Sequence, residues 1–145
     1  MVKKIVYIAG GIGSLTQDSV VSYFNSVKES LEMAGFEVRS PIRGKILDTR
    51  ELQEGGEYCQ RYEPNEIVHR DLWDIKTSDF IIAMPSEYSI GTFMEIALAR
   101  VHFEKPVIIV SNDSRISQHY WIQAFASKIF NNLDDAIEYI ITWYL

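Results

Sequence analysis

The amino-acid sequence predicts a three-layer α/β fold in which a five-stranded parallel sheet carries helices on both faces. Its strand candidates are continuous apolar runs rather than alternating ones, which is typical of parallel strands buried on both sides. Segments with helical spacing separate these runs along the chain. The chain has 145 residues, 47% of them hydrophobic and 23% charged, without repeats or linkers. We therefore expect residues 1–145 to form a single domain.

The first part of the chain predicts a strand, a helix and a second strand. The run 4–10 is apolar and ends in glycine, and 36–40 is the next strand candidate. Between them, 18–34 has helical spacing, and Gly35 fits the position that ends a helix. Its apolar residues share one face: Val20, Phe24, Val27 and Leu31. The polar, irregular stretch 41–64 is long for a loop, so we interpret it as a lid or an ordered excursion.

The middle of the chain repeats this alternation. A helix is expected over 66–76, with Ile67, Leu72 and Ile75 facing inward. The apolar run 79–85 predicts the third strand, and 105–111 predicts the fourth. The helix between them is expected over 92–103. These crossovers predict parallel pairing of the strands.

The last third of the chain completes the pattern. We expect a helix over 115–127, a short strand at 128–130 and a final helix over 133–143, which Asn132 can cap. In a parallel sheet of this kind, ligands bind at the carboxyl ends of the strands, beside the point where the strand order reverses. The segments that follow the strands are therefore where functional residues are expected.

Composition excludes several classes of function. The net charge of −6 argues against binding polymeric nucleic acid or an anionic membrane surface, although a small anionic ligand remains compatible. A single cysteine, Cys59, and three scattered histidines predict neither disulfides nor a metal site. The N-terminal apolar run is too short for a signal peptide, and no run approaches a membrane span. We expect a cytoplasmic protein without a cofactor.

The loop after the first strand is rich in glycine. Gly10, Gly11, Gly13 and Ser14 would let backbone amides approach a ligand. The spacing lacks the final glycine of a dinucleotide-binding motif, and no lysine of a phosphate-binding loop follows. A tight turn without a ligand explains this segment equally well.

The segment after the third strand carries hydroxyls and an acid around a helix start. Ser86, Ser89 and Thr92 supply hydroxyls, Gly91 precedes the helix, and Glu95 lies one turn in, near the strand ends. The alternative is that Glu95 only complements the positive end of the helix.

Two further acids lie on the helix before the third strand. Asp71 and Asp74 are three residues apart, and one can be an exposed acid while the other is a structural cap. Asp71 is followed by apolar residues and fits the edge of a pocket. A solvated surface position is the alternative.

Together these segments resemble the nucleoside 2-deoxyribosyltransferase family. The family pattern has a tyrosine in the first strand, Asp-x-x-x-Ile-x-x-x-Asp before the third, Gly-Thr-x-x-Glu at a helix start and Lys-Pro before the fourth strand. Here these pieces occur in order as Tyr7, Asp71–Asp79, Gly91–Glu95 and Lys105–Pro106. The resemblance covers roughly residues 3–111, with 41–64 unaligned. It implies a Rossmann-like or flavodoxin-like fold.

The resemblance also implies a mechanism. Glu95 would attack the anomeric carbon of a deoxyribose and form a covalent glycosyl ester. Tyr7 would orient Glu95, and Asp71 would protonate the departing base. Gly10, Gly11 and Gly13 would lie against the sugar or its 5′ substituent. The substrate would be a small-molecule nucleoside or nucleotide.

One departure from the family pattern bears on the substrate. Deoxyribosyltransferases usually carry an aspartate where this chain has Ser89, whereas the branch of 2′-deoxynucleoside 5′-monophosphate N-hydrolases has a serine that binds phosphate. Ser89 and Ser14 could form half of a phosphate cradle. The arginine that these hydrolases carry in the first loop is missing. Arg43, or His119 or Arg115 of a neighbouring subunit, could supply the charge.

Several alternatives stay open from the sequence. The family implies dimers in which the neighbour completes the site, and the aromatic residues Trp121 and Trp143 suit either an interface or an intramolecular core. Water as acceptor would make a hydrolase, which Ser89 favours, and a second base would make a transferase. An NAD glycohydrolase and a non-catalytic nucleotide-binding module are the other candidates.

Overall fold

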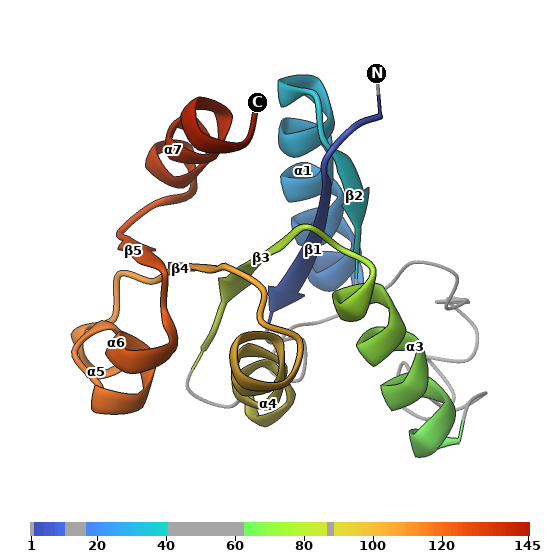
Figure 1. Ribbon diagram of the computed structural model, residues 1–145, viewed down its shortest axis with the longest axis vertical. Coiled ribbons are helices and arrows are strands. Elements are labelled where there is room, and N and C mark those ends of the chain that lie inside the picture. The colour runs from blue at the N-terminus through green and yellow to red at the C-terminus, as the bar shows by residue number, and fades with distance from the viewer. Residues whose placement is uncertain (1, 11–16, 41–62, 87–88) are drawn as a thin grey trace.

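A computed structural model describes residues 2–10, 17–40, 63–86 and 89–145 of the chain. In these ranges the strands form one sheet in the order β2-β1-β3-β4-β5 (Figure 1). All four pairings between neighbouring strands are parallel. This confirms the predicted α/β class, and the order is that of flavodoxin-like folds. The strands are β1 (Ile5–Gly10), β2 (Glu37–Arg39), β3 (Phe80–Met84), β4 (Val107–Val110) and β5 (Lys128–Phe130).

Helices cover both faces of the sheet, as the sequence predicts (Figure 1). One face packs against α1 and α7, and the other packs against α3, α4, α5 and α6. The three-layer arrangement is therefore confirmed. The helices are α1 (Gln17–Ala34), α3 (Pro64–Lys76), α4 (Ile90–Ala97), α5 (Ser114–Ser117), α6 (Tyr120–Phe125) and α7 (Leu133–Tyr144).

Alternation along the central strands divides the apolar residues into two cores. In β1, Val6 and Ile8 face α1 and α7, whereas Tyr7 and Ala9 face the layer of α3 and α4. In the first core the Phe80 ring stacks on Tyr144, with ring centroids 4.4 Å apart. Every residue of β3 is buried, as expected for a strand covered on both faces.

Two predicted helix ends are confirmed. Gly35 adopts a positive φ of 109°, which side-chain-bearing residues rarely adopt, and its N–H donates to the carbonyl of Glu32. Asn132 caps α7, because its side chain accepts a hydrogen bond of 2.9 Å from the N–H of Asp135.

Two predicted helices differ from the structure. The helix expected over 92–103 begins at Ile90, and its end is a π-helical turn, η1 (Leu98–His102). The Phe103 N–H donates to the Leu98 carbonyl, five residues back, and Glu104 then leaves the helix with φ 54°.

The other difference lies in the segment 115–127, which was expected to be one helix. It is broken into α5 and α6. His119 has an extended backbone and starts the second helix by accepting a hydrogen bond from the N–H of Trp121 at Nδ1.

The strand order reverses between β1 and β3, which lie side by side although β2 comes between them in sequence. Gly10 and Met84 pair at the carboxyl end of the two strands. At the amino end, the Asp79 carboxylate accepts a hydrogen bond of 2.7 Å from the N–H of Ile5. Asp79, the second acid of the helix motif, therefore fixes how the two central strands begin.

Gly10 is the point at which β1 has no room for a side chain. A Cβ there would come within 3.0 Å of the ring of Phe24, a fully buried residue of α1. We expect Gly10→Ala to lower the free energy of unfolding by about 1–3 kcal/mol because the packed ring has to shift. Urea denaturation measures the change.

Gly91→Ala is the matched control for this prediction. A Cβ at Gly91 meets nothing within 4 Å, and the residue lies inside α4. Alanine there should leave stability unchanged or raise it by up to about 1 kcal/mol. Equal unfolding midpoints for Gly10→Ala and the wild type would show that the Phe24 ring can retreat without cost.

Candidate active site

Tyr7 stands in the middle of β1, and its side chain is fully buried beneath α3 and α4. Its backbone pairs with Ile81 of β3 on one side and with Arg39 of β2 on the other. The aromatic ring therefore belongs to the second core, while the hydroxyl needs a polar partner there. It makes no hydrogen bond of ordinary length and angle to the described residues.

Glu95 is half-buried in the second turn of α4. Thr92 and Ile96 on either side of it are almost completely buried and seat the helix on the sheet. The first turn of α4 contains no acidic residue, and Glu95 lies beyond it. The interpretation of Glu95 as an acid that complements the helix end is therefore wrong.

Asp71 and Asp74 project from α3, three residues apart and thus on adjacent turns of one face. Asp71 is half-buried, whereas Asp74 is only 1% exposed. Its Oδ2 lies 3.9 Å from Nε of Arg70, one turn earlier. Neither acid caps the helix, so the expectation that one of them is a structural cap is wrong. The sequence signal for a buried acid was the spacing of Asp74 from Arg70 and its place beside Ile75.

The electrostatics of Tyr7 show that these groups come together. Burial raises the pKa of the Tyr7 phenol well above its usual value, and the charges of Glu95 and Asp71 raise it further. Glu95 also raises the pKa as a hydrogen-bond acceptor for the phenol, with a smaller contribution from the charge of Asp74. The phenol therefore stays protonated at neutral pH. Three elements thus bring a tyrosine and three carboxylates to one place.

The turn between β3 and α4 contains two predicted site residues, Ser86 and Ser89. Ser89 is 5% exposed, and its Oγ both donates to the Ser86 carbonyl at 2.7 Å and accepts from the Ser86 N–H at 2.8 Å. Ser86 is half-buried. The two serines hold the start of α4 close to the carboxyl end of β3.

The predicted binding residues Gly10, Gly91 and Thr92 lie on the elements that form this site but differ in burial. Gly10 ends β1 at the same edge of the sheet. Gly91 is exposed in α4, whereas Thr92 is buried and belongs to the packing of the helix. The other predicted binding residues, namely Gly11, Gly13, Ser14 and Arg43, lie outside the described residues.

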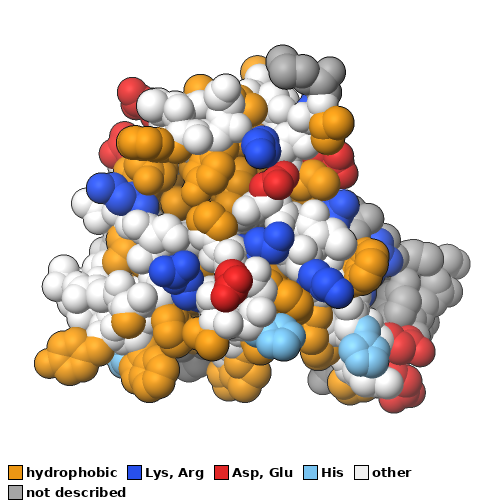
Figure 2. Space-filling view, in the orientation of Figure 1, with side chains coloured by type: hydrophobic (Ala, Val, Ile, Leu, Met, Phe, Trp, Pro, Cys, Tyr) orange, Lys and Arg blue, Asp and Glu red, His pale blue; other side chains and the backbone are white. Residues whose placement is uncertain are grey.

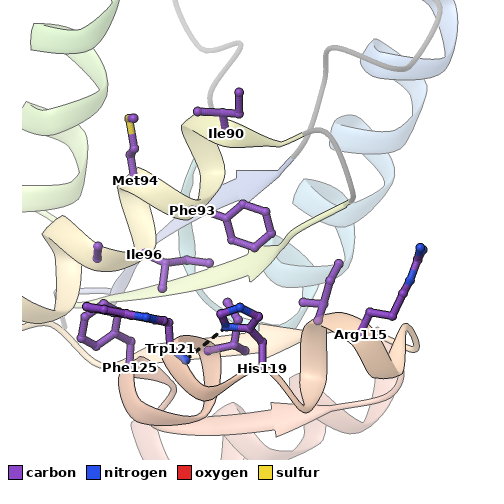
Figure 3. A pocket seen from close by; sticks show the side chains of 11 residues that line it. Ile90, Phe93, Met94, Ile96, Arg115, His119, Trp121 and Phe125 are labelled. Atoms are coloured by element: carbon purple, nitrogen blue, oxygen red, sulfur yellow. Dashed lines mark hydrogen bonds between the residues drawn. The ribbon is translucent and has the colours of Figure 1, made fainter.

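His119 lies on a different side of α4. It lines an apolar pocket of about 470 Å³ between α4 and the α5–α6 segment, whose walls include Phe93 but not Glu95. Figure 3 shows Phe93 extending from α4 over this pocket, with His119 and Trp121 facing it. Arg115 lies at its rim. The pocket that His119 and Arg115 line includes neither Glu95 nor Tyr7.

Two other kinds of feature are absent from the described ranges. No group of three or more His, Cys, Asp or Glu residues there has the arrangement of a metal site. In the same part of the chain, no helix has both the length and the apolar character that a membrane crossing requires.

Comparisons with known proteins agree with the geometry. The family model described as nucleoside 2-deoxyribosyltransferase matches residues 6–133. A similar solved structure is a 2-deoxyribosyltransferase from Bacillus psychrosaccharolyticus, with 20% identity and a TM-score of 0.66 over 93% of this chain and 91% of the other. Another is a 2-deoxyribosyltransferase from Leishmania mexicana, with 17% identity and a TM-score of 0.70 over 98% and 99%. No curated protein sequence matches the chain.

The chain belongs to the nucleoside 2-deoxyribosyltransferase family, because the family model matches most of its length. The resemblance seen in the sequence is thereby confirmed. The chemistry of this family takes place at the N-glycosidic bond of nucleosides. The two solved structures share the fold of this chain.

The raised pKa of Tyr7 makes stability depend on pH in the alkaline range. In the unfolded chain the phenol loses its proton near pH 10.0, whereas the folded protein keeps it, so stability is lost as pH rises above 10. We expect the stability of the wild type relative to Tyr7→Phe to fall by about 1 kcal/mol between pH 10 and pH 11. Urea denaturation at a series of pH values measures it.

An exposed tyrosine provides the control. Tyr120 is 86% exposed in the single chain, so Tyr120→Phe should follow the wild-type pH dependence at protein concentrations at which the chain is monomeric. If Tyr7→Phe also follows the wild-type curve, the phenol of Tyr7 is not held protonated by its surroundings.

Proposed function

We propose that the chain cleaves the N-glycosidic bond of 2′-deoxynucleosides or their 5′-monophosphates through a covalent deoxyribosyl–Glu95 intermediate. One observation carries this proposal. The Tyr7 phenol is fully buried in β1, and the negative charges of Glu95 from α4 and Asp71 from α3 raise its pKa. Two carboxylates from facing helices, at the point where the strand order reverses, provide a nucleophile and an acid.

The reaction would proceed in two displacements. A carboxylate oxygen of Glu95 attacks C1′ of the sugar, and the electron pair of the C1′–N bond leaves with the base. Asp71 supplies a proton to that base, so that it departs neutral. An acceptor then attacks C1′ and releases Glu95, while the ionised Asp71 takes the proton of the acceptor.

Tyr7 would keep Glu95 in a reactive orientation. Its phenol donates toward the carboxylate, and its high pKa keeps the proton on the phenol. The weak acidity of the phenol matters, because a stronger acid would protonate Glu95 and quench its nucleophilicity.

The finer proposal is hydrolysis of a nucleoside 5′-monophosphate. Ser89 places a neutral side chain at the start of α4, and the first turn of the helix has no acid. The positive end of the helix is thus available to a phosphate dianion, which a carboxylate at this position would repel. The alternative is a transferase, in which a second base takes the place of water.

Glu95→Ala should reduce base release by at least about 10³-fold, because the covalent step has lost its nucleophile. Asp71→Asn should reduce it by about 10²- to 10⁴-fold, because the base must leave without a proton. Chromatography measures free base from deoxynucleosides and their 5′-monophosphates, each with and without a second base.

Glu138→Ala is the control, since Glu138 is exposed on α7 in the opposite layer. Full base release by Glu95→Ala would overturn the mechanism. Formation of a new nucleoside on addition of base would identify a transferase. Turnover of NAD, or nucleotide binding without base release, would support the other candidate functions.

We also propose that the protein acts as a homodimer through the outer face of α4 and α6. Met94 of α4 is 60% exposed, Val101 of the following turn η1 is 66% exposed, and Tyr120 and Trp121 of α6 are 86% and 66% exposed. Figure 2 shows hydrophobic side chains gathered along the lower edge of the molecule, where α4 and α6 lie. A monomer rarely leaves such a patch in water. A second copy there would lie beside the helix that carries Glu95.

Met94→Glu should convert the dimer into a monomer, because it places a charge in the centre of this apolar face. Analytical ultracentrifugation measures the mass. Met33→Glu is the matched control, as Met33 is 89% exposed on α1 in the opposite layer. A monomeric wild type, or equal masses for both variants and the wild type, would exclude this interface.

A further inference from the structure

The two serines of the turn between β3 and α4 differ in what their hydroxyls do. The Oγ of Ser89 uses its proton on the Ser86 carbonyl and accepts from the Ser86 N–H. The Ser89 N–H donates to the same carbonyl at 3.1 Å. With the side chain 5% exposed, the Ser89 hydroxyl is committed to the turn itself.

The hydroxyl of Ser86 is in the opposite situation. Its Oγ is buried and has no hydrogen-bond partner in the described part of the chain. A buried hydroxyl without a partner costs about 1–3 kcal/mol, so such a group calls for an explanation. The N–H and carbonyl of Ser86 are both bonded to Ser89, which fixes the backbone. A change of the χ1 rotamer, which leaves this backbone in place, would turn the hydroxyl toward a ligand.

The position of Ser86 points to a ligand at the site already described. It follows Met84 by two residues, and Met84 pairs with Gly10 where the strand order reverses. The turn leads directly into α4, which carries Glu95. Ser86 therefore belongs to the edge of the sheet at which a substrate has to lie.

The roles of the two acids define which end of the substrate Ser86 would meet. This step rests on the proposed function. Glu95 must lie at C1′ of the sugar, and Asp71 must reach the base, so the base points toward α3. The 5′ substituent extends from the opposite side of the sugar ring, toward the turn that holds Ser86.

We infer that Ser86, rather than Ser89, is the specificity-determining hydroxyl of this site and that it binds an oxygen of the 5′ substituent of the sugar. That oxygen belongs either to a 5′-hydroxyl or to a 5′-phosphate. Ser89 is a positioning residue, which holds the backbone of Ser86 through its two hydrogen bonds.

Calorimetric titration with 2-deoxyribose 5-phosphate and with 2-deoxyribose tests this inference without requiring turnover. We expect Ser86→Ala to weaken binding of 2-deoxyribose 5-phosphate by about 10- to 100-fold, because it removes one hydrogen bond to a charged group. The melting temperature should not fall, since the lost hydroxyl has no protein partner. Ser86→Thr keeps the hydroxyl and should retain most of the affinity.

Two variants separate this role from a structural one. Ser89→Ala should lower the melting temperature and weaken the binding of both sugars by a similar factor, because the turn loses the two hydrogen bonds that hold it. Ser78→Ala removes another buried serine hydroxyl, at the amino end of β3, and should change the melting temperature only. A loss confined to the phosphate sugar in Ser86→Ala identifies a 5′-phosphate as the ligand, and an equal loss for both sugars identifies a 5′-hydroxyl.

Unchanged affinity of Ser86→Ala for the sugars would overturn the inference. If the melting temperature of this variant also fell, the Ser86 hydroxyl would be bonded to a buried water molecule and not to a ligand. Failure of the wild type to bind either sugar would overturn it as well. If the wild type binds the sugars through Ser86 but releases no base from any nucleotide, the inference stands and the proposed reaction fails.

Discussion

The parallel pairing of β1 with β3 is the constraint on which the rest of the structure depends. It sets Tyr7 opposite Ile81 and brings the ends of the two strands together at Gly10 and Met84. The helices that follow these strands, α1 and α4, pack on opposite faces of the sheet, which is the arrangement that opens a crevice at the strand ends. Asp79 holds the amino end of the pair through the N–H of Ile5, which prevents the strands from slipping in register.

The carboxylates around the Tyr7 phenol place polar and charged groups where the packing of the sheet favours apolar side chains. A phenol is buried in an apolar core, and α3 and α4 then direct carboxylates toward it. Each of these groups alone is expensive to remove from water, and carboxylates near one another repel. A core optimised for stability alone would place apolar side chains at these positions. Conflicts of this kind are expected where a protein binds or reacts, and here the conflict coincides with the edge at which a substrate would lie.

Most of the fold could be predicted because the strands are short apolar runs with clear ends. The helix ends were harder, because they depend on single residues. Glu104 leaves a helix with a positive φ, and His119 starts one with its ring nitrogen. Neither residue type commonly has that role, so the pattern suggested longer helices.

The site could be predicted as a set of residues but not as a set of contacts. Tyr7, Asp71 and Glu95 are a set that the family resemblance implies, and the structure brings them together. The sequence shows that Ser86 and Ser89 both carry hydroxyls, yet only the structure shows which of the two hydroxyls is hydrogen-bonded within the turn. The burial of Asp74 was not predicted, although Ile75 beside it was expected to face inward, because a charged side chain is normally assigned to the surface.

The strand order also has a consequence for the way the chain folds. Ile5 and Asp79 are 74 residues apart, and the contact between them closes about half of the chain into one loop. Until β3 has been synthesised, β1 can pair only with β2, and the face of β1 that carries Tyr7 is not yet covered by helices. Closing so long a loop is slow because its entropy must be lost before the contacts form. The nascent chain therefore exposes the apolar strand β1 during synthesis, and this is the interval in which aggregation competes with folding.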